Sequence, residues 1–181
     1  MRGGRQSSPD TRTMSEPLAD RNAAALAAAV GVGALARGWK LATAESCTGG
    51  SIAATLTDVP GSSEWFEAGI VTYRLSAKTR LLGVTAATLE RYGAVSEPTA
   101  RAMAEGALRA SGADLVVAVT GTAGPGGGDV LVPVGTVWFA WAGASEHQTL
   151  QTRRCEFVGE RASVRRQAVI CALDGLLQLL R

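Results

Sequence analysis

The sequence predicts a single-domain α/β protein in which a mixed β-sheet lies between two layers of helices, an α/β/α arrangement. Short apolar runs typical of strands alternate with longer alanine- and leucine-rich stretches typical of helices. The nearly continuous Leu, Val and Ala run over residues 114–120 is typical of a strand buried on both faces. The 181 residues, 46% of them hydrophobic, are enough to form one buried core.

The first half of the chain is predicted to contain a tail followed by helices and strands. Residues 1–21 are rich in Gly, Ser, Pro, Asp and Arg and poor in apolar side chains, which predicts a disordered tail before a domain over residues 22–181. The elements predicted next are a helix over residues 23–37, a strand over 40–45, a helix from 48 or 49 to 57, a strand over 66–73, and short helices over 77–82 and 85–92.

The second half begins with a helix that Ser96 is predicted to cap, with Pro98 tolerated in its first turn. The elements predicted after it are the strand over 114–120, a glycine-rich loop over 121–128, antiparallel strands over 134–141 and 148–157, and an amphipathic helix from residue 160 onward. Functional loops of such a sheet lie beyond the carboxyl ends of its strands. The turn at Ser46 and the glycine-rich loop are therefore the candidate functional segments.

The apolar run that ends at Glu45 passes into a polar, glycine-ended turn and then an alanine-rich helix. This strand, turn and helix would lift Ser46 out of the sheet as a small nucleophile. Backbone N–H groups of Thr48, Gly49 and Gly50 would face the group attacked and stabilise an oxyanion, although they also suit a simple helix start. Cys47 is a rival nucleophile, but adjacent residues in a tight turn rarely face the same way, and Ser46 is favoured.

A serine hydroxyl needs a base to activate it. His147, the single histidine, falls in a polar turn, and Lys40 precedes the first strand at the end opposite Ser46. Lys78 follows the second strand and is able to return over the Ser46 turn, but a free lysine has a pKa of about 10.4, so the base hypothesis requires a desolvated amine. The alternative for Lys78 is a surface position. Tyr73 is predicted either to orient the proton or to pack at a strand end.

The loop after Thr120 resembles a phosphate cradle in composition, yet it lacks the spacing of a P-loop or of a dinucleotide-binding motif. It is predicted to bind a generic anion or small ligand. Gly121 and Gly124 of this loop are candidate binding residues, and Thr120 and Thr122 would offer hydroxyl groups.

Composition excludes several classes of function. The net charge is +2 without a basic stripe, so no nucleic-acid partner is expected, and no apolar run is long enough for a membrane span. The three cysteines are odd in number and widely spaced, which predicts free thiols and a cytoplasmic location. With one histidine, no metal or other cofactor is expected. The pairs Arg153-Arg154 and Arg165-Arg166 are interpreted as solvated faces.

Several stretches of the chain, in order, carry a specific resemblance to a known family. They are residues 44–50 (AESCTGG), 56–63 (LTDVPGSS), Tyr73 with Ala77 and Lys78, 81–84 (LLGV), 93–97 (GAVSE), 118–121 (AVTG), 123–125 (AGP) and 133–138 (PVGTVW). Through them the sequence resembles the CinA C-terminal domain family from about residue 23 to the C-terminus.

The resemblance implies a nicotinamide-nucleotide amidohydrolase, which hydrolyses nicotinamide mononucleotide to nicotinic acid mononucleotide and ammonia without a metal. It implies that Ser46 is the nucleophile and Lys78 the activating amine, that Tyr73 matches a motif position, and that the glycine-rich loop lines the nucleotide pocket. By its charge and its position after the last strand, Arg161 or a neighbouring residue is a candidate contact for the substrate phosphate. The small nucleotide is the expected partner, and Trp138, Trp141 and the apolar C-terminal helix favour a homo-oligomer.

The chain departs from the family pattern at two places. Family members commonly have Ser-Asn-Glu after the tyrosine, where this chain has Arg74, Leu75 and Ser76, so the substrate's edge of the pocket is expected to differ. Many relatives also carry an N-terminal domain resembling molybdopterin-binding proteins, whereas a short tail here predicts the stand-alone form. Two alternatives stay open: a non-catalytic nucleotide-binding or competence-associated partner protein, and an amidase for another small carboxamide.

Overall fold

The computed structural model describes residues 22–144 and 149–181. The predicted tail and the turn that contains His147 lie outside the described residues. The elements, in order, are α1 (Ala23–Arg37), β1 (Leu41–Glu45), α2 (Ser51–Thr57), the 3-10 helix η2 (Ser62–Glu64), β2 (Phe66–Val71), α3 (Leu75–Leu82), α4 (Ala86–Tyr92), α5 (Glu97–Ser111), β3 (Leu115–Gly121), β4 (Thr136–Gly143), β5 (Leu150–Glu156) and α6 (Arg161–Leu179).

The described strands form one five-stranded mixed sheet in the order β2-β1-β3-β4-β5. β1 is parallel to both β2 and β3, and its last residue, Glu45, pairs with Val71 on one side and Val119 on the other. β4 is antiparallel to β3 and to β5. The carboxyl ends of β1, β2, β3 and β5 therefore lie at the same edge of the sheet, where α2, α3 and α6 begin.

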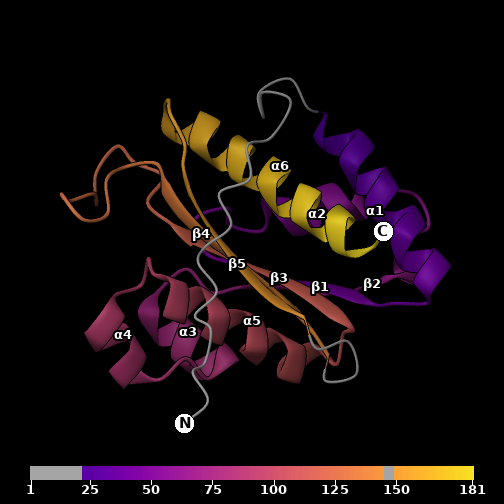
Figure 1. Ribbon diagram of the computed structural model, residues 1–181, viewed down its shortest axis with the longest axis horizontal. Coiled ribbons are helices and arrows are strands. Elements are labelled where there is room, and N and C mark those ends of the chain that lie inside the picture. Colours follow the sequence, from indigo (N-terminus) through magenta and orange to yellow (C-terminus); the bar gives the residue numbers. More distant parts are fainter. Residues whose placement is uncertain (1–21, 145–148) are drawn as a thin grey trace, which may run out of the picture.

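Helices cover both faces of the sheet, as Figure 1 shows: α1, α2 and α6 lie on one face, and α3, α4 and α5 on the other. Each face has its own buried apolar cluster, one built around Trp65, Phe139 and Trp141 and the other around Met103 and small side chains. The predicted single-domain α/β/α fold with a mixed sheet is confirmed. No helix among the described residues is both long enough and apolar enough to cross a membrane.

The predicted helix over residues 23–37, the Ser96 cap and the antiparallel pairing of the last two strands are confirmed. Two predicted boundaries near the site are wrong. α2 begins at Ser51, because Gly49 and Gly50 have positive φ values of 61° and 95° and cannot continue a right-handed helix. β2 ends at Val71, so Thr72 and Tyr73 leave the sheet and α3 begins two residues earlier than predicted.

Candidate active site

Ser46 is the first residue after β1, and the sheet fixes its position from both sides. Its N–H donates a 3.0 Å hydrogen bond to the Val119 carbonyl of β3, and on the other side the Thr72 N–H donates to the Glu45 carbonyl at 2.8 Å. Only 8% of Ser46 is exposed. The predicted strand-turn-helix geometry around this hydroxyl is thus present at the centre of the parallel part of the sheet.

The buried Glu45 carboxylate caps the N-terminus of α2 and is one feature that sequence reasoning missed. Oε2 accepts hydrogen bonds from the N–H groups of Gly50 (2.9 Å) and Ile52 (3.1 Å), and Oε1 accepts from Ala53 N–H (2.8 Å) and the Thr43 hydroxyl (3.1 Å). The partial positive charge of a helix N-terminus favours a carboxylate at this place. Glu45 therefore ties the end of β1 to the start of α2 and holds the turn between them.

The same contacts bear on the predicted oxyanion donors. The Gly50 N–H is taken by Glu45, and the Gly49 N–H donates to the Ser46 carbonyl at 3.1 Å. Within the part of the chain that the structure describes, the N–H groups of Cys47 and Thr48 donate to no backbone carbonyl and lie beside the Cys47 thiol. Thr48 thus stays a candidate donor, while the two glycines serve the turn itself.

Lys78 lies on α3 and reaches back over the Ser46 turn. Its Nζ is 2.8 Å from Ser46 Oγ and 2.6 Å from the Thr72 carbonyl oxygen, and 1% of the residue is exposed. Burial lowers the pKa of the Lys78 amine from 10.5 to about 8. The surface alternative for Lys78 is therefore wrong, and the desolvated environment required of a lysine base is present.

Close packing of α3 against α5 directs Lys78 inward. Gly106 of α5 lies against the backbone of Leu82, where any Cβ would collide with the Leu82 carbonyl group. The Val84 N–H donates to the Lys78 carbonyl at 3.2 Å, which completes the end of α3. Lys40, by contrast, donates from Nζ to the Glu64 carbonyl at the opposite edge of the sheet, as its place before β1 predicts.

Cys47, the rival nucleophile, points into the apolar cluster beneath α6. Burial raises the pKa of its thiol to about 11, so the thiol stays protonated at neutral pH. A protonated, buried thiol is a poor nucleophile. The two neighbours in the turn therefore face different surroundings, and the Ser46 hydroxyl is the one in contact with an amine.

Tyr73, Gly124 and Arg161, three predicted site residues distant in sequence, meet at one point. Arg161, on the first turn of α6, donates from Nη1 to the Gly124 carbonyl and from Nη2 to the Tyr73 hydroxyl, both at 2.9 Å. The hydroxyl of Tyr73, a residue 58% exposed, is thus in contact with a guanidinium. No hydrogen bond joins Tyr73 to Lys78 or Ser46 among the described residues, and its part in proton transfer stays a prediction.

Polar groups at the start of the glycine-rich loop donate hydrogen bonds to backbone carbonyls of neighbouring segments. The Thr120 hydroxyl donates to the Ala94 carbonyl at 2.7 Å, and the Thr122 N–H donates to the Thr136 carbonyl at 2.9 Å. A Cβ at Gly121 would collide with the Thr136 backbone and the Val137 side chain. Gly121 and Thr120 thus build the root of the loop.

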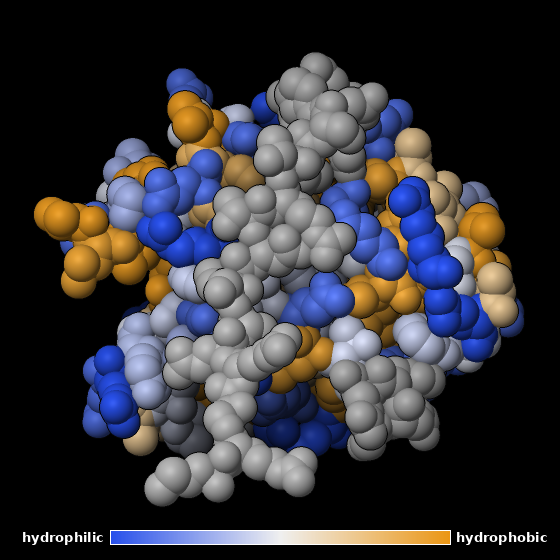
Figure 2. Space-filling model, viewed as in Figure 1, coloured by the Kyte–Doolittle hydropathy of each residue, from blue (hydrophilic) through white to orange (hydrophobic). Residues whose placement is uncertain are grey.

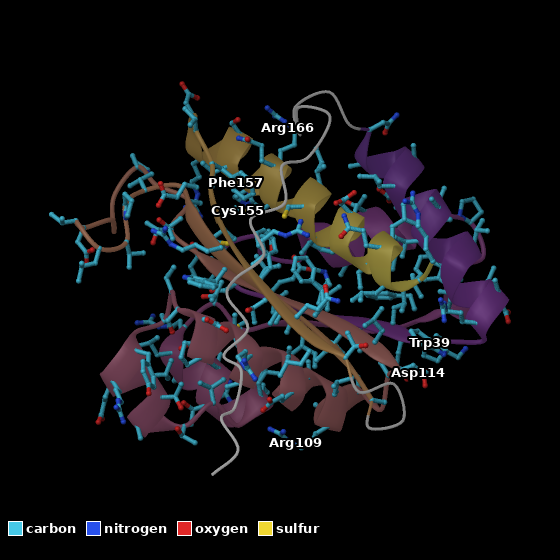
Figure 3. The ribbon with its side chains drawn as sticks, in the orientation of Figure 1. Trp39, Arg109, Asp114, Cys155, Phe157 and Arg166 are labelled. Carbon is cyan, nitrogen blue, oxygen red and sulfur yellow. The ribbon has the colours of Figure 1, made fainter. Side chains whose placement is uncertain are left out.

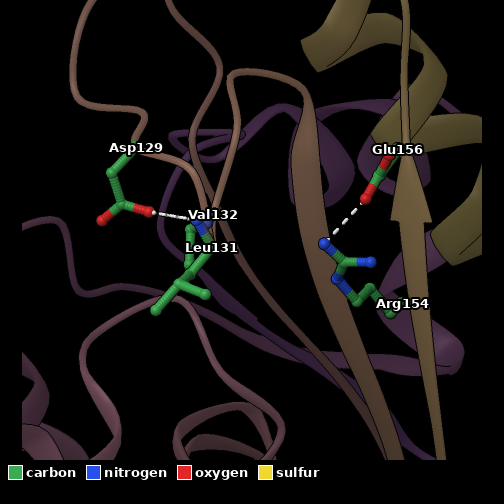
Figure 4. A network of polar contacts seen from close by, with 5 residues as sticks. All are labelled: Asp129, Leu131, Val132, Arg154 and Glu156. Carbon is green, nitrogen blue, oxygen red and sulfur yellow. Dashed lines mark hydrogen bonds and ion pairs between the residues drawn. The ribbon is translucent and has the colours of Figure 1, made fainter.

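The far end of the loop projects from the molecule. Asp129 Oδ1 accepts hydrogen bonds from the N–H groups of Leu131 (2.8 Å) and Val132 (2.7 Å), as Figure 4 shows. This small turn presents Val130 and Leu131, which are 97% and 83% exposed. The apolar projection is visible at the left of Figure 2.

Arg165 of α6 is a second feature that sequence reasoning missed. It donates from Nε to the Cys47 carbonyl at 3.2 Å, and from Nη2 to the Thr48 carbonyl at 2.9 Å and Ser51 Oγ at 3.0 Å. Its interpretation as part of a solvated face is therefore wrong, whereas its neighbour Arg166 is exposed. A signal was present, because Arg161 and Arg165 are four residues apart and share one helix face.

A hollow of about 570 Å³ lies beside the start of α3, lined by Tyr73, Arg74, Leu75 and Ser76. It contains the three positions where the chain departs from the family pattern. Within residues 22–144 and 149–181, no group of three or more His, Cys, Asp and Glu side chains is arranged to hold a metal ion.

These features define a three-layer α/β protein with a buried serine-lysine pair at the carboxyl edge of its parallel strands. Residues 23–180 match the CinA C-terminal domain, and the chain belongs to that family.

Relatives with assigned names support this placement. The chain is 56% identical over 140 residues to the nicotinamide-nucleotide amidohydrolase PncC of Pseudomonas putida, covering 77% of this chain and 86% of that protein. It is 49% identical over 161 residues to the PncC of Escherichia coli K12, covering 89% and 96%. The crystal structure of the competence/damage-inducible protein CihA from Agrobacterium tumefaciens superposes with a TM-score of 0.85 at 38% identity, covering 94% of this chain and all of that one.

Proposed function

We propose that this protein is an enzyme that hydrolyses the carboxamide of nicotinamide mononucleotide to nicotinic acid mononucleotide and ammonia, with Ser46 as nucleophile and Lys78 as base. The observation that carries the proposal is the 2.8 Å contact between the buried Lys78 amine and the Ser46 hydroxyl. The names of relatives about 50% identical supply the substrate.

The first step is activation of Ser46. With a pKa of about 8, roughly a tenth of the Lys78 amines are neutral at pH 7, against about one in three thousand at the pKa of 10.5. The neutral amine donates one N–H to the Thr72 carbonyl, 2.6 Å away, which directs its lone pair toward Ser46 Oγ. Lys78 then takes the hydroxyl proton as Ser46 attacks the carboxamide carbon.

The second step releases ammonia. The Lys78 ammonium passes its proton to the amide nitrogen, the carbon-nitrogen bond breaks, and an ester forms on Ser46. A water molecule, deprotonated by the neutral Lys78, then attacks the ester, and the carboxylate product leaves with Ser46 restored. Lys78 carries the proton in each of these steps, so the proposed mechanism needs no metal ion.

The developing oxyanion requires donors that are not used elsewhere. The N–H groups of Cys47 and Thr48 face only the protonated Cys47 thiol, so they fit this requirement better than those of Gly49 and Gly50, which already donate to oxygen atoms. We therefore propose the N–H groups of Cys47 and Thr48 as the oxyanion donors.

We assign recognition of the nucleotide phosphate to exposed residues beside the Ser46 site. Arg161 is exposed, lies between Tyr73 and Gly124, and carries a charge opposite to that of a phosphate. The loop after Thr122 provides backbone groups beside it. The expected absence of a nucleic-acid partner, the homo-oligomer and the cytoplasmic location stay predictions.

Ammonia release from nicotinamide mononucleotide by the purified protein tests the proposal. Ser46→Ala is expected to lower turnover at least about a thousandfold, because it removes the attacking atom. Ser63→Ala, an exposed serine of η2, is the matched control and is expected to keep full activity. Full activity of Ser46→Ala would remove the mechanism.

A substrate panel separates the alternatives. Nicotinamide, nicotinamide riboside and unrelated primary amides are compared with the mononucleotide by kcat/KM. Faster hydrolysis of another carboxamide would replace the substrate but keep the chemistry. Binding of the mononucleotide without ammonia release would favour the non-catalytic partner protein.

A further inference from the structure

Two cysteine thiols outside the Ser46 site lie in contact with each other. Cys155 is on the strand β5 and Cys171 is on α6, and their sulfur atoms are 3.8 Å apart. Both are free thiols. A disulfide bond requires sulfur atoms about 2.05 Å apart, so the two sulfur atoms must approach each other by less than about 2 Å to join.

The two thiols differ in exposure. β5 is at the edge of the described sheet, and Cys155, labelled in Figure 3, is partly exposed there, against the middle of α6. Cys171 is fully buried between α6 and the sheet. Cys155 is therefore the thiol that is more accessible to a small oxidant in solution.

Arg153 places a positive charge beside the pair. Its Nη1 is 3.8 Å from Cys171 Sγ, and its guanidinium lies over the Trp141 ring, 5.3 Å from the ring centroid. The contact with the Cys171 thiol and the Arg153 charge lower the pKa of Cys155, against the effect of burial. The contact with Cys155 and burial raise the pKa of Cys171. The partly exposed sulfur is thus the better thiolate, and the buried one keeps its proton.

We propose that Cys155 and Cys171 form a reversible thiol-oxidation site for small hydroperoxides, with Cys155 as the attacking thiol and Cys171 as the resolving thiol. The Cys155 thiolate attacks one peroxide oxygen, the oxygen-oxygen bond breaks, and the leaving oxygen departs as water or an alcohol after taking a proton. Cys155 becomes a sulfenic acid.

In the second step the Cys171 sulfur attacks the Cys155 sulfur. The sulfur-oxygen bond breaks, and the hydroxide leaves as water with the Cys171 proton. For hydrogen peroxide, two thiols and one peroxide give one disulfide and two water molecules. A small dithiol in excess reverses the reaction by thiol-disulfide exchange.

The disulfide would join the edge strand β5 to α6, the helix whose first turns carry Arg161 and Arg165. Neither cysteine contacts Ser46 or Lys78 among the described residues. Oxidation of the pair therefore needs no amide hydrolysis to be detected, and it is measured by mass rather than by activity.

The test is titration of the reduced protein with hydrogen peroxide, followed by intact mass spectrometry and tryptic mapping without reductant. The expected product has lost two hydrogen atoms and regains them with dithiothreitol. Trypsin should release a cross-linked pair joining residues 155–161 to residues 167–181. Cys47→Ser is the matched control and should give the same product, because Cys47 lies elsewhere in the core.

Single variants test the order of attack. Cys171→Ser should accumulate a Cys155 sulfenic acid that a cyclic 1,3-diketone traps, whereas Cys155→Ser should leave Cys171 unlabelled. Cys155→Ala and Cys171→Ala repeat the measurement, with circular dichroism to show that each variant is folded. Arg153→Gln should slow the oxidation at least about threefold.

Three results would overturn the proposal. They are a disulfide between two chains in place of the internal one, oxidation of both cysteines to sulfinic acids without a cross-link, and a Cys155→Ser variant whose Cys171 reacts as fast as the wild-type pair.

Discussion

The turn at residues 46–50 and the loop at residues 122–135 leave the same edge of the sheet but are held in opposite ways. The turn is fixed from two sides: the buried Glu45 carboxylate accepts from Gly50 and from the start of α2, and Arg165 donates to the Cys47 and Thr48 carbonyls. The loop is joined to α6 through Arg161 and ends in an exposed apolar projection.

This difference matches the two tasks of the proposed enzyme. A nucleophile must be positioned within about 0.5 Å, which requires buried and fully bonded supports. A loop that recognises the substrate needs exposed groups and tolerates more variation. Substitutions of residues that support the turn should therefore lower turnover strongly. Substitutions in the loop should have the smallest effect on turnover.

The largest effect is expected at Lys78. Lys78→Met should reduce turnover at least about a thousandfold, because no other base touches Ser46 among the described residues. The free energy of unfolding should stay within about 1 kcal/mol of wild type, because removing a desolvated amine offsets the loss of its hydrogen bond to Thr72. Activity assays and urea denaturation measure the two effects.

Lys40→Met is the matched control for Lys78→Met, because Lys40 lies at the opposite edge of the sheet. It should keep wild-type turnover. Wild-type turnover in Lys78→Met would show that the buried amine is structural.

The pH profile tests the state of the Lys78 amine. Because its pKa is lowered to about 8, kcat/KM should rise about tenfold per unit below pH 8 and level off above it. Stability should also increase between pH 8 and 10.5, because there the unfolded chain still binds the proton that the folded protein has lost. A flat kcat/KM profile from pH 6 to 9 would contradict the assignment.

Glu45→Gln tests the support beneath the turn. The amide NH₂ group cannot accept hydrogen bonds, so part of the α2 N-terminus loses its partner, and we expect a loss of about 1 to 3 kcal/mol in unfolding free energy. Turnover should fall about ten- to a hundredfold with little change in KM. Glu105→Gln, on the exposed face of α5, should change neither quantity. An unchanged kcat in Glu45→Gln would exclude a positioning role.

Arg165→Gln should have a smaller effect, because the turn keeps its contacts with Glu45. We expect a threefold to tenfold fall in kcat from the loss of hydrogen bonds to the Cys47 and Thr48 carbonyls. The exposed Arg166→Gln has the same change in charge and should behave as wild type. Equal effects of the two variants would indicate a general electrostatic role.

The smallest effect is expected in the loop. Leu131→Ser exchanges an exposed apolar side chain, so the free energy of unfolding should change by less than about 0.5 kcal/mol and kcat by less than twofold. Thermal denaturation and steady-state kinetics measure both. A loss of turnover comparable to that of Glu45→Gln would show that the loop, too, belongs to the catalytic support.

The sequence by itself determined the fold class and the elements that bound the site. Hydrophobic periodicity and the Ser96 cap are local signals, and they located the helices and the strands to within a few residues. The glycines after Thr48 marked a tight turn. The scarcity of lysine directed attention to Lys78.

The tertiary structure alone decided the environment of those residues. Lys78 is buried, and its pKa lowered, because the helix that carries it, α3, packs against α5. Arg165 reaches the Ser46 turn from more than a hundred residues away in the sequence. Desolvation and long-range hydrogen bonds arise from segments distant in the chain, so no local pattern encodes them.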